Sequence, residues 1–231
     1  MKYNNIVKAT FISRPNRFIA NVMIDGAPVT VHVKNTGRCR ELLVPGATVF
    51  LEKSDNPVRK TLYDLVAVQK GNRLVNMDSQ IPNAAAYEWI SAGGFKKDVR
   101  LLKREVTFGN SRFDLYLEYT DEAGKIRKAF VEVKGVTLED DGVVRFPDAP
   151  TERGIKHIHE LTECLEEGYE AYLLFVIQMK DVKYFEPDRE IHKDFADALR
   201  EASERGVHVL AYDCEVKENS MEIRDPVEVR L

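Results

Sequence analysis

Short stretches of alternating hydrophobic and polar residues fill the first third of the chain, which is the pattern of strands that bury one face. FIANVMID and VTVHV flank the turn Gly26-Ala27-Pro28 and predict a β-hairpin. Further strands are predicted at ATVFLEK, TLYDLVAVQ and GNRLV, after the turn-rich segment NTGRCRELLVPG. About five short strands within residues 1–80 favour a small all-β barrel.

From residue 81 the pattern changes to alternating helices and strands. The first helix is predicted at 84–91, with Asn83 as its N-cap and the Gly93-Gly94 pair as its stop. The order αβββαβαβ predicts an α/β domain over residues 81–231. Its other strands are predicted at 99–108, 112–119, 128–137, 171–179 and 207–212, and its other helices at 150–167 and 188–205.

Charge is distributed unevenly between these two units, although the net charge of the chain is only −4. Residues 1–80 hold 12 Lys and Arg against 6 Asp and Glu, whereas residues 81–231 hold 22 against 32. A basic unit suits a polyanionic partner. Two ordinary solvated surfaces of unequal charge would give the same totals, so charge alone does not identify a function.

The sequence carries no sign of a targeting or membrane segment. Its start, MKYNNIVKATF, lacks the apolar core of a secretory signal, and its longest apolar run, AYLLFVI, is too short to span a bilayer. The three cysteines are widely spaced and odd in number, which fits neither a disulfide framework nor a zinc site. We therefore expect a cytoplasmic protein with reduced thiols and no membrane partner.

The predicted barrel is typical of an oligonucleotide-binding fold, whose exposed strand face and loops hold single strands with basic and aromatic side chains. Phe18 and Tyr63 are aromatic candidates for that face, but we predict them as core residues because large apolar side chains are usually buried. The basic candidates are Arg14, Arg17, Arg59 and Lys60.

The segment FVEVKGVT at residues 130–137 places two charges in an otherwise apolar strand. Because successive side chains in a strand point to opposite faces, Val131 and Val133 share one face while Glu132 and Lys134 share the other. One face therefore suits the core, and the other presents two opposite charges.

The hairpin that contains this strand has a register that pairs Asp114 with Glu132. If the turn DEAGK is centred at residue 123, the numbers of paired residues sum to a constant. The same register pairs Glu118 with Lys128 and brings two aromatic residues together, and both contacts are favourable. A slip of one residue would move Asp114 to the apolar face.

Two facing carboxylates repel each other unless a positive charge lies between them or one is protonated. Lys134 can supply that charge in a purely structural role. Mg²⁺ or Mn²⁺ can also supply it, bound by Asp114, Glu132 and the Val133 carbonyl, while Lys134 positions a water molecule. Two further acids can complete such a site or can be solvated side chains, and they are Glu88 and Glu105.

A second chemical signal is FPDAPTERGIKHIHEL, in which Asp148 or Thr151 can cap a helix. Arg153, His157 and Glu160 follow the helical spacing i, i+4 and i+7 and form one polar stripe. Beside a metal site this stripe can bind phosphate or orient the ligands. On the outside of the domain it would be an ordinary solvent face.

Four segments together resemble the sugar fermentation stimulation protein A family: HVKNTGRCRELL, SRFD, VEVKGVT and FPDAPTERGIKHIHEL. They occur in the family's order, and the similarity runs from one end of the chain to the other. The resemblance implies an N-terminal barrel like the oligonucleotide-binding fold. It also implies a second, α/β domain with a mixed central sheet, similar to the restriction-endonuclease-like nucleases that carry a D…E-x-K motif.

The resemblance also implies roles for individual residues. Asp114 and Glu132 match the metal-binding acids of those nucleases, and Lys134 matches the lysine that activates water. On the following helix, RecB-like nucleases often carry Gln-x-x-x-Tyr. This chain has Arg153 and His157 at that spacing, so its helix departs from the pattern, and both residues remain candidates for phosphate contact or ligand support.

The resemblance extends to NTGRCREL in the barrel. Asn35, Thr36 and Gly37 can form a turn whose amides meet a phosphate, with Arg38 and Arg40 beside it. A structural turn that fixes the contact between the two domains explains the same residues equally well.

These features predict a DNA-binding protein of the sugar fermentation stimulation type with a Mg²⁺-dependent phosphodiesterase site. The alternative is a non-catalytic DNA-binding regulator of sugar metabolism genes with a vestigial nuclease fold. The presence of Asp114, Glu132 and Lys134 together favours catalysis, because a degraded site would have lost at least one of them. No helix-turn-helix, P-loop or dinucleotide motif supports another class. The sequence leaves open RNA as the partner in place of DNA, and the oligomeric state.

Overall fold

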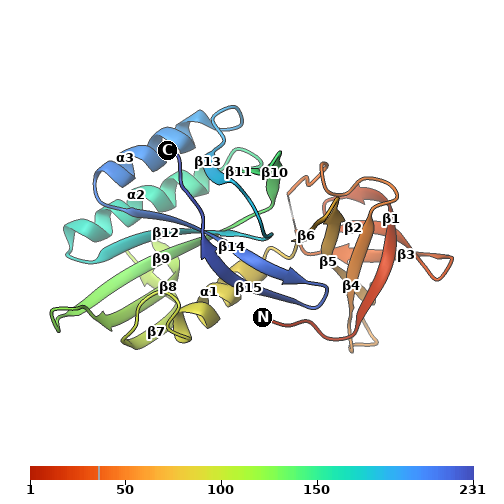
Figure 1. Cartoon of the computed structure of the whole chain (residues 1–231), viewed down its shortest axis with the longest axis horizontal. Helices are drawn as coiled ribbons and strands as arrows, with labels where there is room; N and C mark the ends of the chain where they lie inside the picture. Colours follow the sequence, from red (N-terminus) through yellow and green to blue (C-terminus); the bar gives the residue numbers. More distant parts are fainter. Residues whose placement is uncertain (36) are drawn as a thin grey trace.

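The computed structural model describes residues 1–35 and 37–231, which form two domains side by side (Figure 1). Strands β1 to β6 build the first domain, and the elements from α1 to β15 build the second. In the part of the chain that is described, no helix is long and apolar enough to cross a membrane. The three cysteines are buried and free.

The first domain is a barrel of the oligonucleotide-binding type. Its strands follow the order β3-β2-β1-β4-β5-β6, and a short parallel pairing of β3 with β5 closes the sheet on itself. Val22, Val31, Leu51 and Leu65 fill the interior and are fully buried. The strands are β1 (Ile6–Asn16), β2 (Ile19–Ile24), β3 (Ala27–Val33), β4 (Thr48–Lys53), β5 (Tyr63–Lys70) and β6 (Arg73–Asn76).

The predicted hairpin is confirmed as β2 and β3, which pair along their whole length. The hydrophobic pattern misses β1, because only Ala9 and Phe11 of this strand are buried and the alternation is weak. Tyr63 is half-buried and packs against the core, as predicted. The prediction of Phe18 as a core residue is wrong, because its position in the tight turn between β1 and β2 leaves it 52% exposed.

The second domain is built on a six-stranded sheet in the order β15-β14-β12-β9-β8-β7. β12 runs parallel to both β9 and β14, whereas the other neighbours are antiparallel, so the predicted mixed sheet is confirmed. The strands are β7 (Val99–Phe108), β8 (Ser111–Thr120), β9 (Ile126–Val136), β12 (Glu170–Ile177), β14 (His208–Lys217) and β15 (Ser220–Pro226).

Helices cover both faces of this sheet (Figure 1). α2 (Glu152–Glu166) and α3 (Lys193–Glu204) pack on one face, where Ile158 and Phe195 join the core around Phe130. α1 (Ile81–Ser91) packs on the other face, against Leu115 and Val131. The face that carries Glu132 and Lys134 is therefore the one that α2 approaches.

The structure adds elements that the sequence pattern does not predict. β10 (Leu138–Asp140), β11 (Val143–Phe146) and β13 (Tyr184–Pro187) form a small separate sheet. α1 begins at Ile81 rather than at 84, because Pro82 is tolerated in the first turn of a helix. Asn83 is therefore inside the helix and is not its N-cap.

Hydrogen bonds join the two domains at the end of β6. Gln178 Nε2 donates to the backbone oxygens of Asn76 and Asp78 and to Asn76 Oδ1 at 3.0–3.1 Å, and the Asn76 N–H donates to the Gln178 carbonyl at 2.9 Å. Asn76 Nδ2 also donates to the Tyr3 hydroxyl at 2.8 Å. Because these polar groups satisfy one another in the interior, the contact fixes how the domains lie together.

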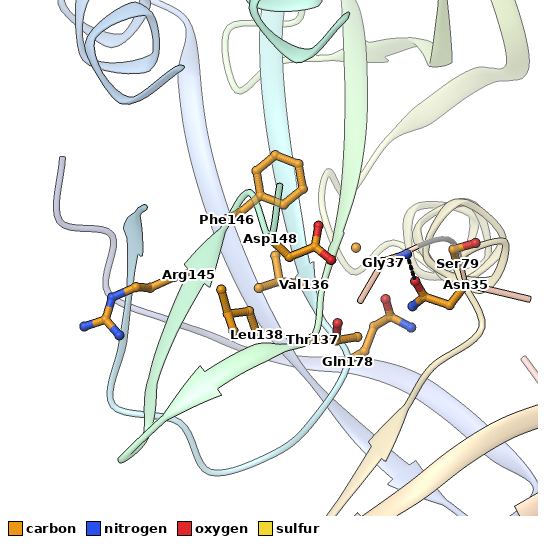
Figure 2. Close-up of a pocket in the computed structure, with 11 residues that line it drawn as sticks. Asn35, Gly37, Ser79, Val136, Thr137, Leu138, Arg145, Phe146, Asp148 and Gln178 are labelled. Carbon is orange, nitrogen blue, oxygen red and sulfur yellow. Dashed lines mark hydrogen bonds between the residues drawn. The ribbon is translucent and has the colours of Figure 1, made fainter. Parts of the chain in front are cut away.

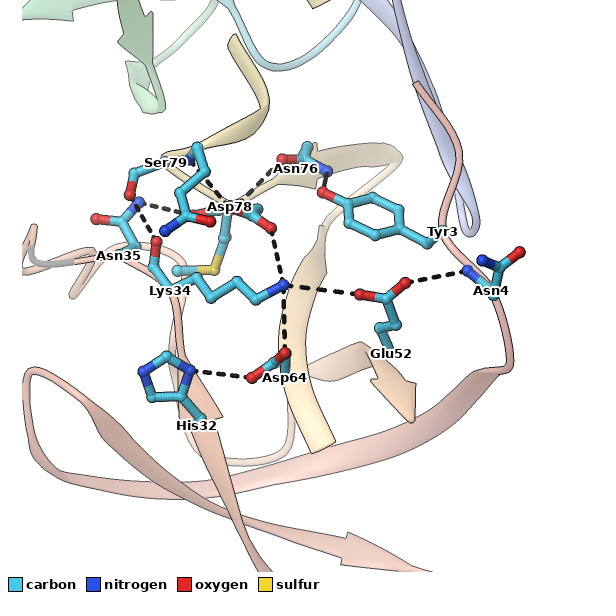
Figure 3. A network of polar contacts seen from close by, with 12 residues as sticks. Tyr3, Asn4, His32, Lys34, Asn35, Glu52, Asp64, Asn76, Asp78 and Ser79 are labelled. Atoms are coloured by element: carbon cyan, nitrogen blue, oxygen red, sulfur yellow. Dashed lines mark hydrogen bonds and ion pairs between the residues drawn. The ribbon is translucent and has the colours of Figure 1, made fainter. Parts of the chain in front are cut away.

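A buried charge cluster, here called the Lys34 cluster, lies beside this junction (Figure 3). The Lys34 ammonium lies 3.2 Å from Asp64, 3.5 Å from Asp78 and 3.6 Å from Glu52. Arg59 donates two further hydrogen bonds to Asp64, at 2.6 and 3.0 Å. The cluster therefore brings cations to every carboxylate that it buries.

Candidate functional site

The predicted register of the β8–β9 hairpin is confirmed. Glu118 pairs with Lys128, and the ladder runs with the same offset to Leu115 and Val131. One step further, Asp114 Oδ2 accepts a hydrogen bond from the Val133 N–H at 2.8 Å. Asp114 therefore lies beside Glu132. The role of the Val133 carbonyl as a metal ligand stays a prediction.

The Asp114 carboxylate has a second fixed partner, because Asn83 Nδ2 of α1 donates to Oδ1 at 2.6 Å. Burial raises the pKa of Asp114 to about 6, and the nearby negative charge of Glu132 adds to the rise. The sequence pattern predicts Asn83 as a helix cap and gives no sign of this contact with Asp114. Only the packing of α1 against the sheet reveals it.

Glu132 is only 3% exposed, and its two carboxylate oxygens differ. Oε1 accepts a hydrogen bond from Lys134 Nζ at 2.7 Å and contacts His157 Nδ1. Oε2 is buried and has no hydrogen-bond partner among the described residues. Burial acts to raise the pKa of Glu132, but the hydrogen bond with His157 and the charge of Lys134 outweigh it, so the pKa is lowered.

The polar stripe of α2 faces the sheet at His157, which is buried. Arg153 Nε donates to His157 Nε2 at 3.4 Å, and the other ring nitrogen, Nδ1, forms a hydrogen bond with Glu132 Oε1. Glu160 is also buried but bonds to Ser111 instead. The interpretation of the stripe as a solvent face is therefore wrong for His157 and Glu160, and holds only for Arg153, which is exposed.

The two additional acids do not join this cluster. Glu88 Oε2 accepts a hydrogen bond from the N-terminal ammonium of Met1 at 2.5 Å. Glu105 is exposed and lies 3.7 Å from Arg112. The cross-strand register places Glu105 opposite Asp114, but its backbone has a φ of 56°, which breaks the regular strand geometry. The candidate centre therefore contains two carboxylates, those of Asp114 and Glu132.

Two predicted nucleic-acid contacts in the barrel are structural instead. Arg14 donates to four backbone carbonyls, those of Arg17, Asn35, Gly37 and Arg38, at 2.6–2.8 Å. Arg59 is held by Asp64 in the Lys34 cluster. Both guanidinium groups are thus held by acceptors of the barrel, Arg14 by backbone carbonyls and Arg59 by the Asp64 carboxylate.

Asn35 is also part of the frame, since its side chain donates to the Met77 carbonyl and accepts from the Gly37 N–H at 2.7 Å. Thr36 lies outside the described residues. Lys60 is exposed in the loop before β5 and stays a prediction. Arg17 and Arg38 are exposed around a hollow of about 200 Å³ that Arg40 also lines.

A cavity of about 150 Å³ lies between the two domains (Figure 2). Asn35, Gly37 and Ser79 line one side, and Gly135, which directly follows Lys134, lies on the other. Figure 2 shows the Asp148 carboxylate directed toward Gly37, where an added Cβ would collide with it. The predicted turn at Asn35 and Gly37 therefore does meet the second domain.

Comparison with known proteins gives matches for both domains. Residues 12–77 match the family model described as the SfsA N-terminal OB domain. Residues 80–220 match the one described as the sugar fermentation stimulation protein RE domain. The chain is 58% identical to a sugar fermentation stimulation protein homolog of Clostridium beijerinckii over the full length of both chains. A homolog from Desulfitobacterium hafniense is 59% identical over all of this chain and 99% of its own.

A solved structure is similar in fold as well. It is described as the structure of Pyrococcus furiosus SfsA in complex with Ca²⁺. It matches with a TM-score of 0.87 and 27% sequence identity, covering 100% of this chain and 98% of the other. Sequence, domain order and fold thus agree along the whole chain, which belongs to the sugar fermentation stimulation protein family.

Proposed function

We propose that this protein binds nucleic acid, with DNA as the expected substrate, and hydrolyses its phosphodiester bonds with a divalent cation held by Asp114 and Glu132. The observation that carries the proposal is Glu132 Oε2, a buried carboxylate oxygen without a partner among the described residues. Burying such an oxygen is costly unless a ligand completes its surroundings.

The residues present fit a divalent cation. Within residues 1–35 and 37–231 no group of three or more His, Cys, Asp or Glu side chains is arranged to hold a metal ion, and the donors that we propose are the two carboxylates of Asp114 and Glu132. Mg²⁺ suits a pair, because it commonly takes one or two carboxylates, keeps several waters and takes further ligands from substrate phosphates. A cation would also relieve the repulsion that helps to raise the pKa of Asp114.

The surrounding side chains hold both carboxylates in place. Asn83 and the Val133 N–H orient Asp114, while His157 and Lys134 orient Glu132. Such fixed partners are the usual support of metal ligands. When bound, Mg²⁺ or Mn²⁺ would supply positive charge at the phosphate and acidify a nearby water.

Lys134 and Arg153 extend from this centre toward solvent. The Lys134 ammonium is held 2.7 Å from Glu132 and is partly exposed, so it can position the water that attacks phosphorus. Arg153 has an exposed guanidinium, which can contact a substrate phosphate. His157 is buried and acts through Glu132 and Arg153 rather than on the substrate.

The comparisons support two parts of the proposal. The relative from Pyrococcus furiosus is described as a complex with Ca²⁺, and Ca²⁺ prefers the same oxygen donors as Mg²⁺. The N-terminal OB domain belongs to a fold that often binds single-stranded nucleic acid.

Cleavage of labelled single- and double-stranded DNA and RNA with Mg²⁺ or Mn²⁺ tests the proposal. We expect Asp114→Asn to lower the cleavage rate by at least about 10²-fold, the scale on which loss of a charge-stabilising group acts. Glu118→Gln is the matched control, because it removes one carboxylate from the same strand and should leave the rate unchanged. If the wild-type protein binds nucleic acid but neither cleaves it nor responds to the cation, it is a non-catalytic binding protein and the proposal fails.

A further inference from the structure

Four arginines of the barrel line one hollow, and the three that are exposed have no carboxylate partner among the described residues. Arg17, Arg38 and Arg40 are exposed, and none lies within 4.0 Å of an acidic side chain among the described residues. Arg59 and Arg73 of the same domain are paired with Asp64 and Glu139. The hollow, here called the arginine hollow, therefore concentrates unneutralised positive charge.

The backbone under the arginine hollow is rigidly held. The Arg14 guanidinium bridges two segments of the rim, because it binds the carbonyl of Arg17 on one side and those of Gly37 and Arg38 on the other. The rim is thus organised before any ligand arrives. Preorganisation of this kind reduces the entropic cost of binding a ligand.

The arginine hollow adjoins the interdomain cavity. Gly37 lines both, and the far wall of the cavity includes Gly135, the residue after Lys134. Phe18, next to Arg17, exposes an aromatic ring at the same end of the barrel. A strand that extends from the candidate metal site along the cavity would meet positive charge and an exposed aromatic side chain, the two features that single-strand-binding surfaces combine.

We propose that the arginine hollow binds a backbone phosphate of the nucleic acid whose cleavage site lies at Asp114 and Glu132. Guanidinium groups form paired hydrogen bonds with phosphate oxygens, and three exposed ones line this hollow. The choice of nucleic acid over another phosphorylated ligand rests on the proposed function. The contact would hold the strand without reading its sequence.

The test is a salt titration of binding, with a labelled single-stranded oligonucleotide in EDTA so that no cleavage occurs. For Arg38→Ala/Arg40→Ala we expect affinity to fall about tenfold, and the slope of log affinity against log salt to become shallower by about 0.7, the loss of one phosphate contact. The fall should be the same for unrelated oligonucleotide sequences.

The matched control is Arg205→Ala/Arg224→Ala, which changes the net charge equally at two exposed sites paired only with surface acids. Arg17→Ala, on the other rim, gives an independent variant if the double variant is unstable. If the arginine-hollow variants show the same affinity and slope as the control, the inference is wrong. It is also wrong if inorganic phosphate stabilises the wild type through Arg38 and Arg40 while oligonucleotide binding is unaffected by their loss.

Failure of the phosphate contact at the arginine hollow can be distinguished from failure of the nuclease proposal. Cleavage at saturating oligonucleotide should remain in Arg38→Ala/Arg40→Ala, because its carboxylate pair is intact. If the wild type does not cleave but the salt slope still depends on Arg38 and Arg40, the phosphate contact stands and the nuclease proposal fails. If the wild type cleaves and the loss of Arg38 and Arg40 leaves the salt slope unchanged, the nuclease proposal stands and the phosphate contact fails.

Discussion

Two regions of this protein bury carboxylates beside a lysine, and they differ in how the charge is balanced. In the Lys34 cluster, Asp64 receives Lys34, Arg59 and His32 within 3.2 Å. In the second domain, Lys134 forms an ion pair with Glu132, and among the described residues the hydrogen-bond donors to Asp114 are two neutral groups, Asn83 Nδ2 and the Val133 N–H. Each region contains a carboxylate that is only 3% exposed, Asp64 in one and Glu132 in the other, but the supply of cations differs.

The pKa values of the two aspartates follow this difference. Burial acts to raise the pKa of Asp64, but the hydrogen bonds from Arg59 and the charge of Lys34 outweigh it and lower the pKa to about 2. For Asp114, burial and Glu132 raise the pKa to about 6. The Lys34 cluster is neutralised by its own side chains and is part of the structure, whereas the proposed function assigns a divalent cation to the pair Asp114 and Glu132.

The largest expected effect is a difference in stability between variants of the two aspartates. Asp64→Asn leaves Arg59 without its carboxylate partner, while Lys34 keeps Asp78 and Glu52, so we expect the free energy of unfolding to fall by about 3 kcal/mol. Asp114→Asn removes a charge that the fold stabilises poorly, and its cost should be at least about 2 kcal/mol smaller. Urea unfolding of both variants measures this difference, and equal losses would contradict the contrast between the clusters.

Divalent cations should stabilise the folded protein through the second region only. With Mg²⁺ or Mn²⁺ at about one hundred times its dissociation constant, we expect about 2.7 kcal/mol of added stability for the wild type. Asp114→Asn should lose this effect, whereas Asp64→Asn should keep it. Thermal unfolding with and without EDTA makes the measurement. Equal stabilisation of wild type and Asp114→Asn would show that the cation binds elsewhere.

Acid should lower the free energy of unfolding through Asp64, by less than the substitutions above. The folded pKa of Asp64 is depressed to about 2 from an ordinary value of 3.8, so its contribution is complete above about pH 4. It is lost as pH falls from there toward 2. The wild type should therefore lose more stability than Asp64→Asn over this interval in urea titrations at several pH values. Parallel losses would show that Asp64 is not held as a charged group.

The sequence alone could predict the β8–β9 register and hence the neighbourhood of Asp114 and Glu132. A hairpin has a two-residue side-chain period and a turn whose position is visible, so local rules determine which residues meet. The spacing i, i+4 likewise predicts that Arg153 and His157 lie on one face of α2, because helical periodicity is also a local rule.

Other features depend on contacts between distant segments, which no local pattern contains. Asn83 meets Asp114 because α1 packs across the sheet, and Glu88 on the same helix points to the N-terminus instead. Arg14 and Arg59 are of the residue type that contacts nucleic acid, yet the fold surrounds them with carbonyl or carboxylate oxygens. Only the three-dimensional structure shows which arginines remain available to contact nucleic acid.

Gly37 of the barrel lies very close to Asp148 of the second domain. Its φ is not in the left-handed region, so the need for glycine there comes from space: a single added carbon would collide with Asp148. The residue lines both the arginine hollow and the interdomain cavity. A side chain at position 37 would have to displace the Asp148 carboxylate, so glycine lets this loop of the barrel and Asp148 of the second domain approach each other closely.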